Sequence, residues 1–431
     1  MLNLHEKVQT DNASRGPEFT WRRWVVLGLL LAITTINFVD RQTLSVLAPV
    51  LRAAFQLSNE QYGRIVAALQ FGMMSGEFPM GALMDRWGAR LGLCFAVLWW
   101  SAATGTQVVT NSGLKFGVVR YWMGTGECGN YSGGMKTVMQ VFPEQERTLA
   151  IGIFNSGSMI GATIAPPIIV FLLQRYGFHA AFIVPAIAGL IWVPMWWFGR
   201  GKERFSPSAR SNIFSSDSVK TLLSERRTWA VMLCRFFIGP VIQFYWYWIP
   251  NYLFSVRHMS MVRIGLVAWL PFLLGTVGGV AGGFAANLLQ RRGFSTLNVR
   301  RITMYGSSIA CLTSLLVPEM KGIASALAMI GAAILADNFL SANMYGAITD
   351  LFPDRRVGRV TGLTGVAGGF SGLLFPLLTG FLVDRLSYRP VFLLIGVMPL
   401  LGTLALFLLA NNYNREAPAS IPDFAPERGK F

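Results

Sequence analysis

Apolar runs long enough to cross a lipid bilayer recur along nearly the whole chain, and no other feature restricts its fold as strongly. About 20 residues in a helix span the ~30 Å hydrocarbon core of a membrane. Because that core offers the backbone no water to bond with, we expect such runs to be α-helices. About twelve spans are expected, at residues 24–48, 61–82, 91–111, 114–141, 149–174, 178–199, 229–255, 263–289, 302–319, 322–350, 358–383 and 390–412.

The composition agrees with an all-α membrane protein. Of 431 residues, 53% are hydrophobic and 13% are charged, whereas a soluble domain carries about a quarter charged residues. The net charge of +16 does not indicate nucleic-acid binding, because most Lys and Arg residues fall in the tails and in alternate loops, as the positive-inside rule describes. This distribution predicts a multi-pass protein of the cell inner membrane with both termini in the cytoplasm. The polar stretch Met1–Arg23 has no short apolar core of the kind found in signal peptides.

Cysteine and histidine usage gives no sign of a metal site or a catalytic centre. The four cysteines fall inside apolar spans without metal-ligand spacing, so we interpret them as packing residues. The sequence has no HExxH motif, no Ser-His-Asp set and no Gly-rich phosphate loop. We therefore predict that the protein is not an enzyme and uses neither a metal nor a cofactor.

A polar stretch at residues 200–228, rich in Ser, Arg and Lys, divides the expected spans into two groups of six. When the first half of the sequence is aligned with the second, residues 142–144 (Phe-Pro-Glu) fall on residues 352–354 (Phe-Pro-Asp). Parallel six-helix repeats of this kind occur in transporters whose substrate site lies between the repeats. We predict an N-terminal bundle over 1–199, a cytoplasmic linker over 200–228, and a C-terminal bundle with a cytoplasmic tail over 229–431.

Charged residues interrupt two of the apolar spans. Asp40 and Arg41 fall in the first span, and Arg120 and Glu127 in the fourth. A charge near the bilayer centre costs roughly 2.5–3.5 kcal/mol, so it usually faces a cavity and has a function. We interpret these four residues as lining an aqueous pathway. The alternative is that they form two ion pairs that only hold helices together. The alignment that places 142–144 on 352–354 also places Glu127 on Asp337. Each half is therefore expected to contribute one acid to the cavity.

A second motif stands between the second and third spans. The segment Gly81-Ala-Leu-Met-Asp85-Arg86-Trp-Gly88-Ala-Arg90 resembles the GxxxD(R/K)xGxR signature of the major facilitator superfamily at every defining position. The resemblance implies a gating motif in which Asp85 and its basic neighbours form a charge latch to another helix, which holds one access state. The alternative is an ordinary basic turn.

Four longer stretches, at residues 37–49, 127–138, 142–162 and 229–253, resemble the anion:cation symporter family and, within it, bacterial hexuronate transporters. The resemblance covers nearly the whole chain. It implies the major facilitator fold and proton-coupled symport of a sugar acid, such as glucuronate or galacturonate, by alternating access. The expected partners are therefore a small sugar-acid anion, a proton and the lipid bilayer, and we expect a monomer.

The resemblance also implies roles for particular residues. Arg41 is expected to bind the substrate carboxylate, while Asp40 and Glu127 carry the proton and Arg120 controls Glu127. Polar groups would bind hydroxyls and flat rings would cover the apolar face of the sugar. The remaining substrate-binding residues are expected to be Asn37, Gln70, Arg120, Asn155, Tyr245, Trp246, Trp248, Asp337 and Asn338. Glu77 is a further acid in the second span, to which we assign no role.

Other substrates stay open at this point. A transporter of another organic anion, such as an aldonate or an aromatic carboxylate, fits the same charges. A phosphate-ester antiporter would use one arginine from each half, but Arg235 stands close to the beginning of its span. A drug:proton efflux pump for cations is disfavoured, because Arg41 and Arg120 suit an anion.

Overall fold

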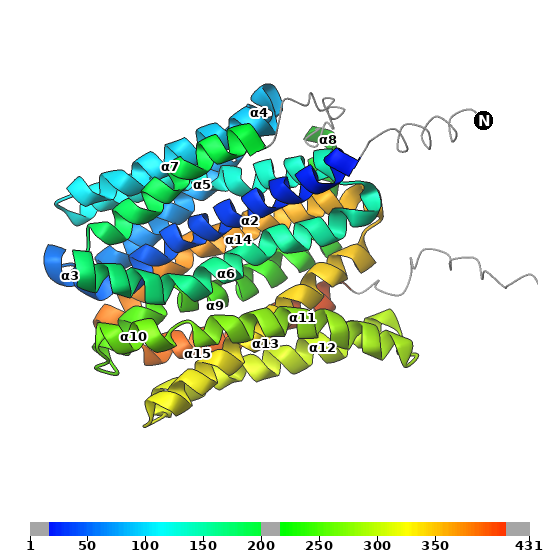
Figure 1. The fold of residues 1–431 in the computed structure, drawn as a ribbon. Coiled ribbons are helices and arrows are strands. Elements are labelled where there is room, and N and C mark those ends of the chain that lie inside the picture. The colour runs from blue at the N-terminus through cyan, green and yellow to red at the C-terminus, as the bar shows by residue number, and fades with distance from the viewer. Residues whose placement is uncertain (1–16, 200–215, 411–431) are drawn as a thin grey trace, which may run out of the picture.

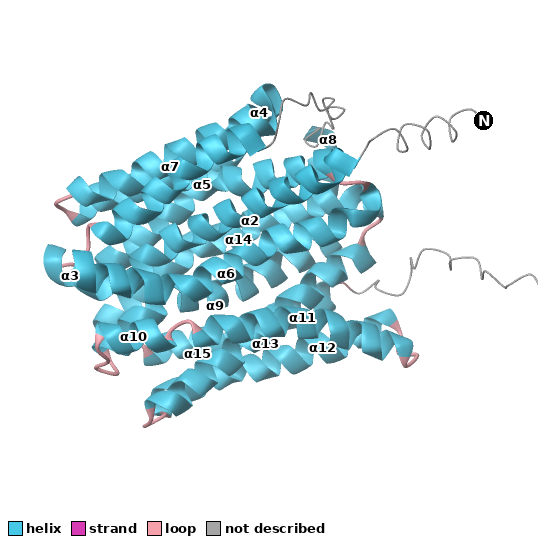
Figure 2. Ribbon diagram, in the orientation of Figure 1, coloured by secondary structure: helices cyan, strands magenta, loops and turns pink. Residues whose placement is uncertain are grey.

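The computed structural model describes residues 17–199 and 216–410, and helices account for nearly all of them (Figures 1 and 2). No strand occurs in these two ranges. The elements are α2 (Pro17–Val46), α3 (Ala48–Phe55), α4 (Asn59–Thr106), η1 (Gln107–Val109), α5 (Gly113–Val141), α6 (Glu144–Tyr176), α7 (Ala180–Gly199), α8 (Ser216–Ser224), α9 (Arg226–Ser255), α10 (Met261–Val267), α11 (Leu270–Arg291), α12 (Thr296–Ala310), η2 (Cys311–Glu319), α13 (Ile323–Leu351), α14 (Asp354–Arg385) and α15 (Arg389–Leu409).

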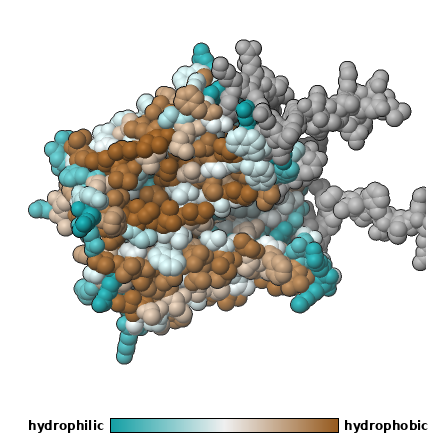
Figure 3. All heavy atoms as spheres, in the orientation of Figure 1, coloured by the Kyte–Doolittle hydropathy of each residue, from teal (hydrophilic) through white to brown (hydrophobic). Residues whose placement is uncertain are grey.

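The long helices lie side by side, and their surface is apolar across the middle and polar at both ends (Figure 3). Among the described residues, nine helical segments are long and apolar enough to cross a membrane. One of them, Asn59–Val109, covers one of the expected spans completely and the next one except for its last two residues. The less apolar helix α5, and α12 together with η2, account for the expected spans that are not among the nine. The all-α membrane fold predicted from the sequence is confirmed.

The chain reverses direction within α4, at Gly88. This residue has φ 76° and ψ 160°, a conformation that residues with a Cβ rarely adopt. Leu57, just before α4, packs so closely on Gly113, just after η1, that a Cβ at Gly113 would lie 2.6 Å from Leu57 Cδ2. Both ends of α4 therefore lie at the same end of the bundle, and Gly88 forms the turn between two antiparallel helices.

The predicted internal repeat relates α5 to α13 and α6 to α14 in the structure. The shift that places Phe142 on Phe352 also places both ends of α5 on the ends of α13. It places the first residue of α6 on the first residue of α14, and each of these two helices begins directly after a proline. The second half begins with α9 at Arg226, slightly before the predicted boundary, and α8 lies inside the predicted linker. Residues 200–215 and the tail after 410 lie outside the described ranges, so the domain limits stay predictions.

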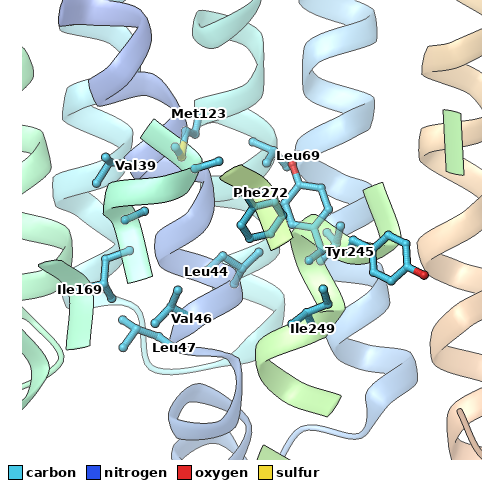
Figure 4. Close-up of a cluster of buried hydrophobic side chains, with 14 of the residues drawn as sticks. Val39, Leu44, Val46, Leu47, Leu69, Met123, Ile169, Tyr245, Ile249 and Phe272 are labelled. Atoms are coloured by element: carbon cyan, nitrogen blue, oxygen red, sulfur yellow. The ribbon is translucent and has the colours of Figure 1, made fainter. Parts of the chain in front are cut away.

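Apolar side chains join the two halves at one end of the bundle. Helix α2 begins and α15 ends at the same end of the molecule (Figure 1), which we call the termini end; the opposite end, where α3 lies, is the far end. Leu44, near the far end of α2, and Leu47, between α2 and α3, belong to one buried cluster with Ile249 of α9 and Phe272 of α11 (Figure 4). This cluster packs the first half against the second on the far-end side of the buried charges.

Candidate functional site

The centre of the candidate site is an ion pair between α2 and α5. Arg41 Nε donates to Glu127 Oε2 at 2.7 Å, and the Glu127 side chain is completely buried while Arg41 is 14% exposed. The Arg41 guanidinium also lies 4.8 Å from the centre of the Phe38 ring. Among the described residues neither Nη group of Arg41 has a protein acceptor. Arg41 can therefore hold Glu127 and still offer two donors to a ligand.

Three further polar side chains are buried beside this pair with polar atoms that lack partners. In the described part of the chain, both oxygens of Asp40, both amide atoms of Asn37, and Nε and Nη2 of Arg120 make no hydrogen bond, although the Trp100 indole lies close to Asp40. Arg120 Nη1 makes only a long contact, 3.4 Å, with the backbone oxygen of Asp40. A buried polar group without a partner costs about 1–3 kcal/mol, so these atoms are candidate contacts for a polar ligand or a proton.

Glu127 has a direct partner that the sequence did not suggest. The sequence predicted that Arg120, about 10 Å away along the axis of the same helix, controls Glu127. In the structure, Arg41 of α2 bonds directly to the carboxylate, and Arg120 acts on Glu127 only through its charge.

Among residues 17–199 and 216–410, no group of three His, Cys, Asp or Glu residues could hold a metal.

Two tyrosines complete the site, and sequence analysis missed both. Tyr62 donates from its hydroxyl to the backbone oxygen of Tyr247 at 2.7 Å, and neither residue is more than 2% exposed. Tyr247, from the second half, lies near the charges of Arg41, Glu127 and Arg120. Successive helix residues point about 100° apart, so the aromatic run 244–248 cannot face one site as a whole. Because α9 is apolar on all sides, the sequence gives no signal for which of these aromatic residues faces the site.

The predicted aromatic residues occupy three different environments. Tyr245 is fully buried and bonds through its hydroxyl to Ser314 Oγ at 2.7 Å, inside the second half. Trp246 packs edge-on against Phe38, with ring centres 5.5 Å apart. Trp248 packs in the same way on Tyr62 at 5.0 Å. Trp246 and Trp248 therefore contact the first half, whereas Tyr245 does not face the ion pair.

In the described part of the chain, no hydrogen bond or ion pair links the remaining predicted substrate residues to Arg41 or Glu127. Asp337 is buried in the second half near Tyr245 and Arg235, and its Oδ1 atom has no partner among the described residues. Asn338 donates to a backbone oxygen of its own helix at 3.0 Å. Asn155 is exposed on α6 and Gln70 is half-buried on α4.

The predicted gating motif forms the turn at the termini end of α4. Asp85 Oδ1 accepts a hydrogen bond from Lys136 Nζ at 2.7 Å, but Lys136 lies on α5 and therefore in the same half. Arg90 donates to the Trp197 backbone oxygen and lies 4.2 Å from the ring centre, while Arg86 is exposed and no neighbouring atom lies within 4 Å of a Cβ at Gly81. The charge contact to another helix exists, but in this structure it does not join the two halves.

Asp85→Asn should therefore favour the state seen here. The Asp85 side chain is 81% exposed, so its pair with Lys136 contributes at most about 1 kcal/mol. We expect a latch to the second half to form when the two halves approach each other at the termini end. A neutral amide at residue 85 would weaken that latch. Labelling of a single cysteine at the termini end, Gly362→Cys, should then become faster. Unchanged labelling would reduce the motif to a turn.

A bundle of membrane-spanning helices in two related halves, with buried charges where the halves meet, is the architecture of a membrane transporter. The sequence matches the family model of the Major Facilitator Superfamily over residues 30–341 and 298–429. The chain belongs to this superfamily. It is accordingly a multi-pass membrane transporter and not an enzyme.

Similar proteins are known from sequence and from structure. The chain is 27% identical to the hexuronate transporter of Escherichia coli K12, covering 90% of this chain and 94% of that protein. It is 27% identical to the probable L-galactonate transporter of the same strain, covering 88% of each. Its fold resembles the crystal structure of a D-xylose-proton symporter, with a TM-score of 0.73 and 14% identity over 91% of this chain and 99% of that one. A bacterial homologue of the human lysosomal transporter Spinster, solved in an inward-facing conformation, gives a TM-score of 0.71 at 18% identity, covering 93% and 97%.

Proposed function

We propose that this protein is a proton-coupled symporter that imports an anionic sugar acid, a hexuronate such as glucuronate or galacturonate, across the cell inner membrane by alternating access. The single observation that carries the proposal is the buried ion pair of Arg41 with Glu127, which lies beside a second acid, Asp40, that has no ion-pair partner among the described residues. The names of the similar E. coli proteins, a hexuronate transporter and a probable L-galactonate transporter, support the substrate class.

The ion pair supplies a direct link between proton and anion. When Glu127 is protonated, it no longer neutralises Arg41, and the planar guanidinium is free to bind the substrate carboxylate through two parallel hydrogen bonds. A proton and a monovalent anion together add no net charge to the buried site. When the substrate leaves, Glu127 gives up its proton and pairs with Arg41 again, as it does in this structure.

Arg120 and Asp40 adjust this exchange. Arg120 is fully buried and adds a second positive charge near Glu127, which favours an anionic ligand. Asp40 has no ion-pair partner among the described residues, and a carboxyl group buried in this way costs less free energy as the neutral acid. Asp40 is therefore the second proposed proton carrier.

Uptake into proteoliposomes tests the proposal. Radiolabelled glucuronate or galacturonate should accumulate when the outside is made acidic and should only equilibrate without a pH gradient. Accumulation that ignores the gradient would contradict proton coupling. Competition by aldonates, aromatic carboxylates or sugar phosphates that exceeds competition by hexuronates would contradict the proposed substrate.

Asp337→Asn should change which sugar acids compete for uptake while proton-driven accumulation persists. The Asp337 Oδ1 atom lacks a partner in the described part of the chain, and a buried acceptor of this kind favours a hydroxyl donor. The measurement is a competition panel of hexuronates, aldonates and neutral sugars against both proteins. An unchanged ranking together with lost accumulation would show that the second half carries the proton.

A further inference from the structure

A chain of four hydrogen-bonded residues crosses between the two halves at the far end. Arg52 Nη1 of α3 donates to Asn251 Oδ1 of α9 at 3.0 Å. Asn251 Nδ2 donates to Asn59 Oδ1 of α4 at 3.2 Å, and Asn59 Nδ2 donates to Asp384 Oδ1 of α14 at 2.7 Å. Each link joins one half to the other, so the two halves cannot separate at this end without breaking all three.

Asp384 makes the strongest part of this chain, because it also binds the beginning of α4. Its Oδ1 accepts from the backbone nitrogen of Asn59 at 3.0 Å, and its Oδ2 accepts from the backbone nitrogen of Glu60 at 2.7 Å. The first nitrogens of a helix have no acceptor within the helix and carry partial positive charge, so a carboxylate stabilises them. A residue of the second half therefore acts here as a cap for a helix of the first half.

The glycines of α4 and α14 show that these helices are packed most closely at the far end and are separated at the termini end. Gly63 lies so close to α14 that a Cβ would be 2.4 Å from the backbone oxygen of Pro376, and a Cβ on Gly380 would be 2.5 Å from that of Asn59. Gly81 and Gly362 lie about five helical turns from Gly63 and Gly380 respectively, hence on the same helix faces. No neighbouring atom comes within 4 Å of a Cβ at either.

We propose that Arg52, Asn251, Asn59 and Asp384, the far-end lock, hold this end shut and must separate for the site to open there. Only an interaction that differs between two states can shift their balance. The lock exists when the far end is closed and the termini end is open, and its bonds across the halves are lost when the far end opens. Asp384 thus sets the population of the two access states. The inference uses alternating access from the proposed function, but neither the substrate nor the proton.

Two single-cysteine reporters test the lock, each in a background whose native cysteines are replaced by alanine. Ala67→Cys lies on α4 one turn from Gly63 and is 4% exposed, so it reacts only when the far end opens. Gly362→Cys lies on the open part of α14. With protein in lipid nanodiscs and a polar maleimide, Asp384→Ala should speed labelling of the first reporter by about tenfold, which corresponds to about 1.4 kcal/mol, and slow labelling of the second.

Glu319→Gln is the matched control. It removes a carboxylate from an exposed ion pair with Arg389 at the same end, but both partners belong to the second half, so neither labelling rate should change. Asn59→Ala, which breaks two links of the lock and spares the backbone bonds to Asp384, should shift both rates in the same directions as Asp384→Ala.

Labelling that stays unchanged in both variants would overturn the proposal. A parallel rise at both reporters would also overturn it, because the whole bundle would then be loosened instead of shifted between states. No sugar acid is present in this experiment. A labelling result that contradicts the lock would therefore not contradict proton-coupled uptake. An uptake result that contradicts proton coupling would likewise not contradict the lock.

Discussion

Arg41→Lys should weaken binding of glucuronate or galacturonate by about tenfold to a hundredfold, while the protein still folds and inserts. Arg41 can donate from Nε to Glu127 at 2.7 Å and from its outer edge to a carboxylate at the same time. Lysine has a single ammonium group and no planar fork, so it bonds poorly to Glu127 and the substrate carboxylate at the same time. A hydrogen bond to a charged group contributes about 1.5–3 kcal/mol, and about 1.4 kcal/mol corresponds to a factor of ten.

The matched control for this substitution is Arg300→Lys. Arg300 Nε pairs with Asp350 Oδ2 at 2.7 Å within the second half, so the geometry of the lost bond is the same but its place is different. Isothermal titration with each sugar acid should show a loss of affinity for Arg41→Lys only. Affinity in Arg41→Lys equal to that of the parent would remove Arg41 from the carboxylate site.

Glu127→Gln should abolish accumulation of the substrate against its gradient and leave exchange across the membrane intact. A neutral amide imitates the protonated acid, so Arg41 stays free for the substrate, but no proton is carried. One coupled proton supports about tenfold accumulation for each pH unit, because each unit contributes about 1.4 kcal/mol. Proteoliposomes with an imposed pH gradient should therefore lose this factor and keep counterflow of labelled for unlabelled substrate.

Asp350→Asn controls for the loss of a carboxylate that pairs with an arginine. It breaks the bond of Arg300 at the same length of 2.7 Å and should lower thermal stability while accumulation persists. Gradient-driven accumulation that survives Glu127→Gln would move the proton to another acid of the membrane helices, namely Asp40, Glu77 or Asp337.

The residues of the candidate site could be recognised from the sequence more easily than their partners. The charges of Asp40, Arg41, Arg120 and Glu127 stood out, because charged groups are rare within apolar spans. Tyr247 did not stand out in an aromatic run. Its position depends on how far α9 is rotated about its own axis, and a helix of which all sides are apolar gives no periodic signal for that rotation.

What the sequence by itself determined is the fold class and the register of the repeat. A backbone in lipid must satisfy its own hydrogen bonds, so each long apolar run has to be a helix, and the shift that places Phe142 on Phe352 relates α5 to α13 at both ends. Only the tertiary structure decided that Glu127 pairs with Arg41 of a distant helix, and that α4 and α14 meet at Gly63 and Gly380 but not at Gly81 and Gly362. Such contacts depend on the rotation and tilt of whole helices, which packing between distant segments sets.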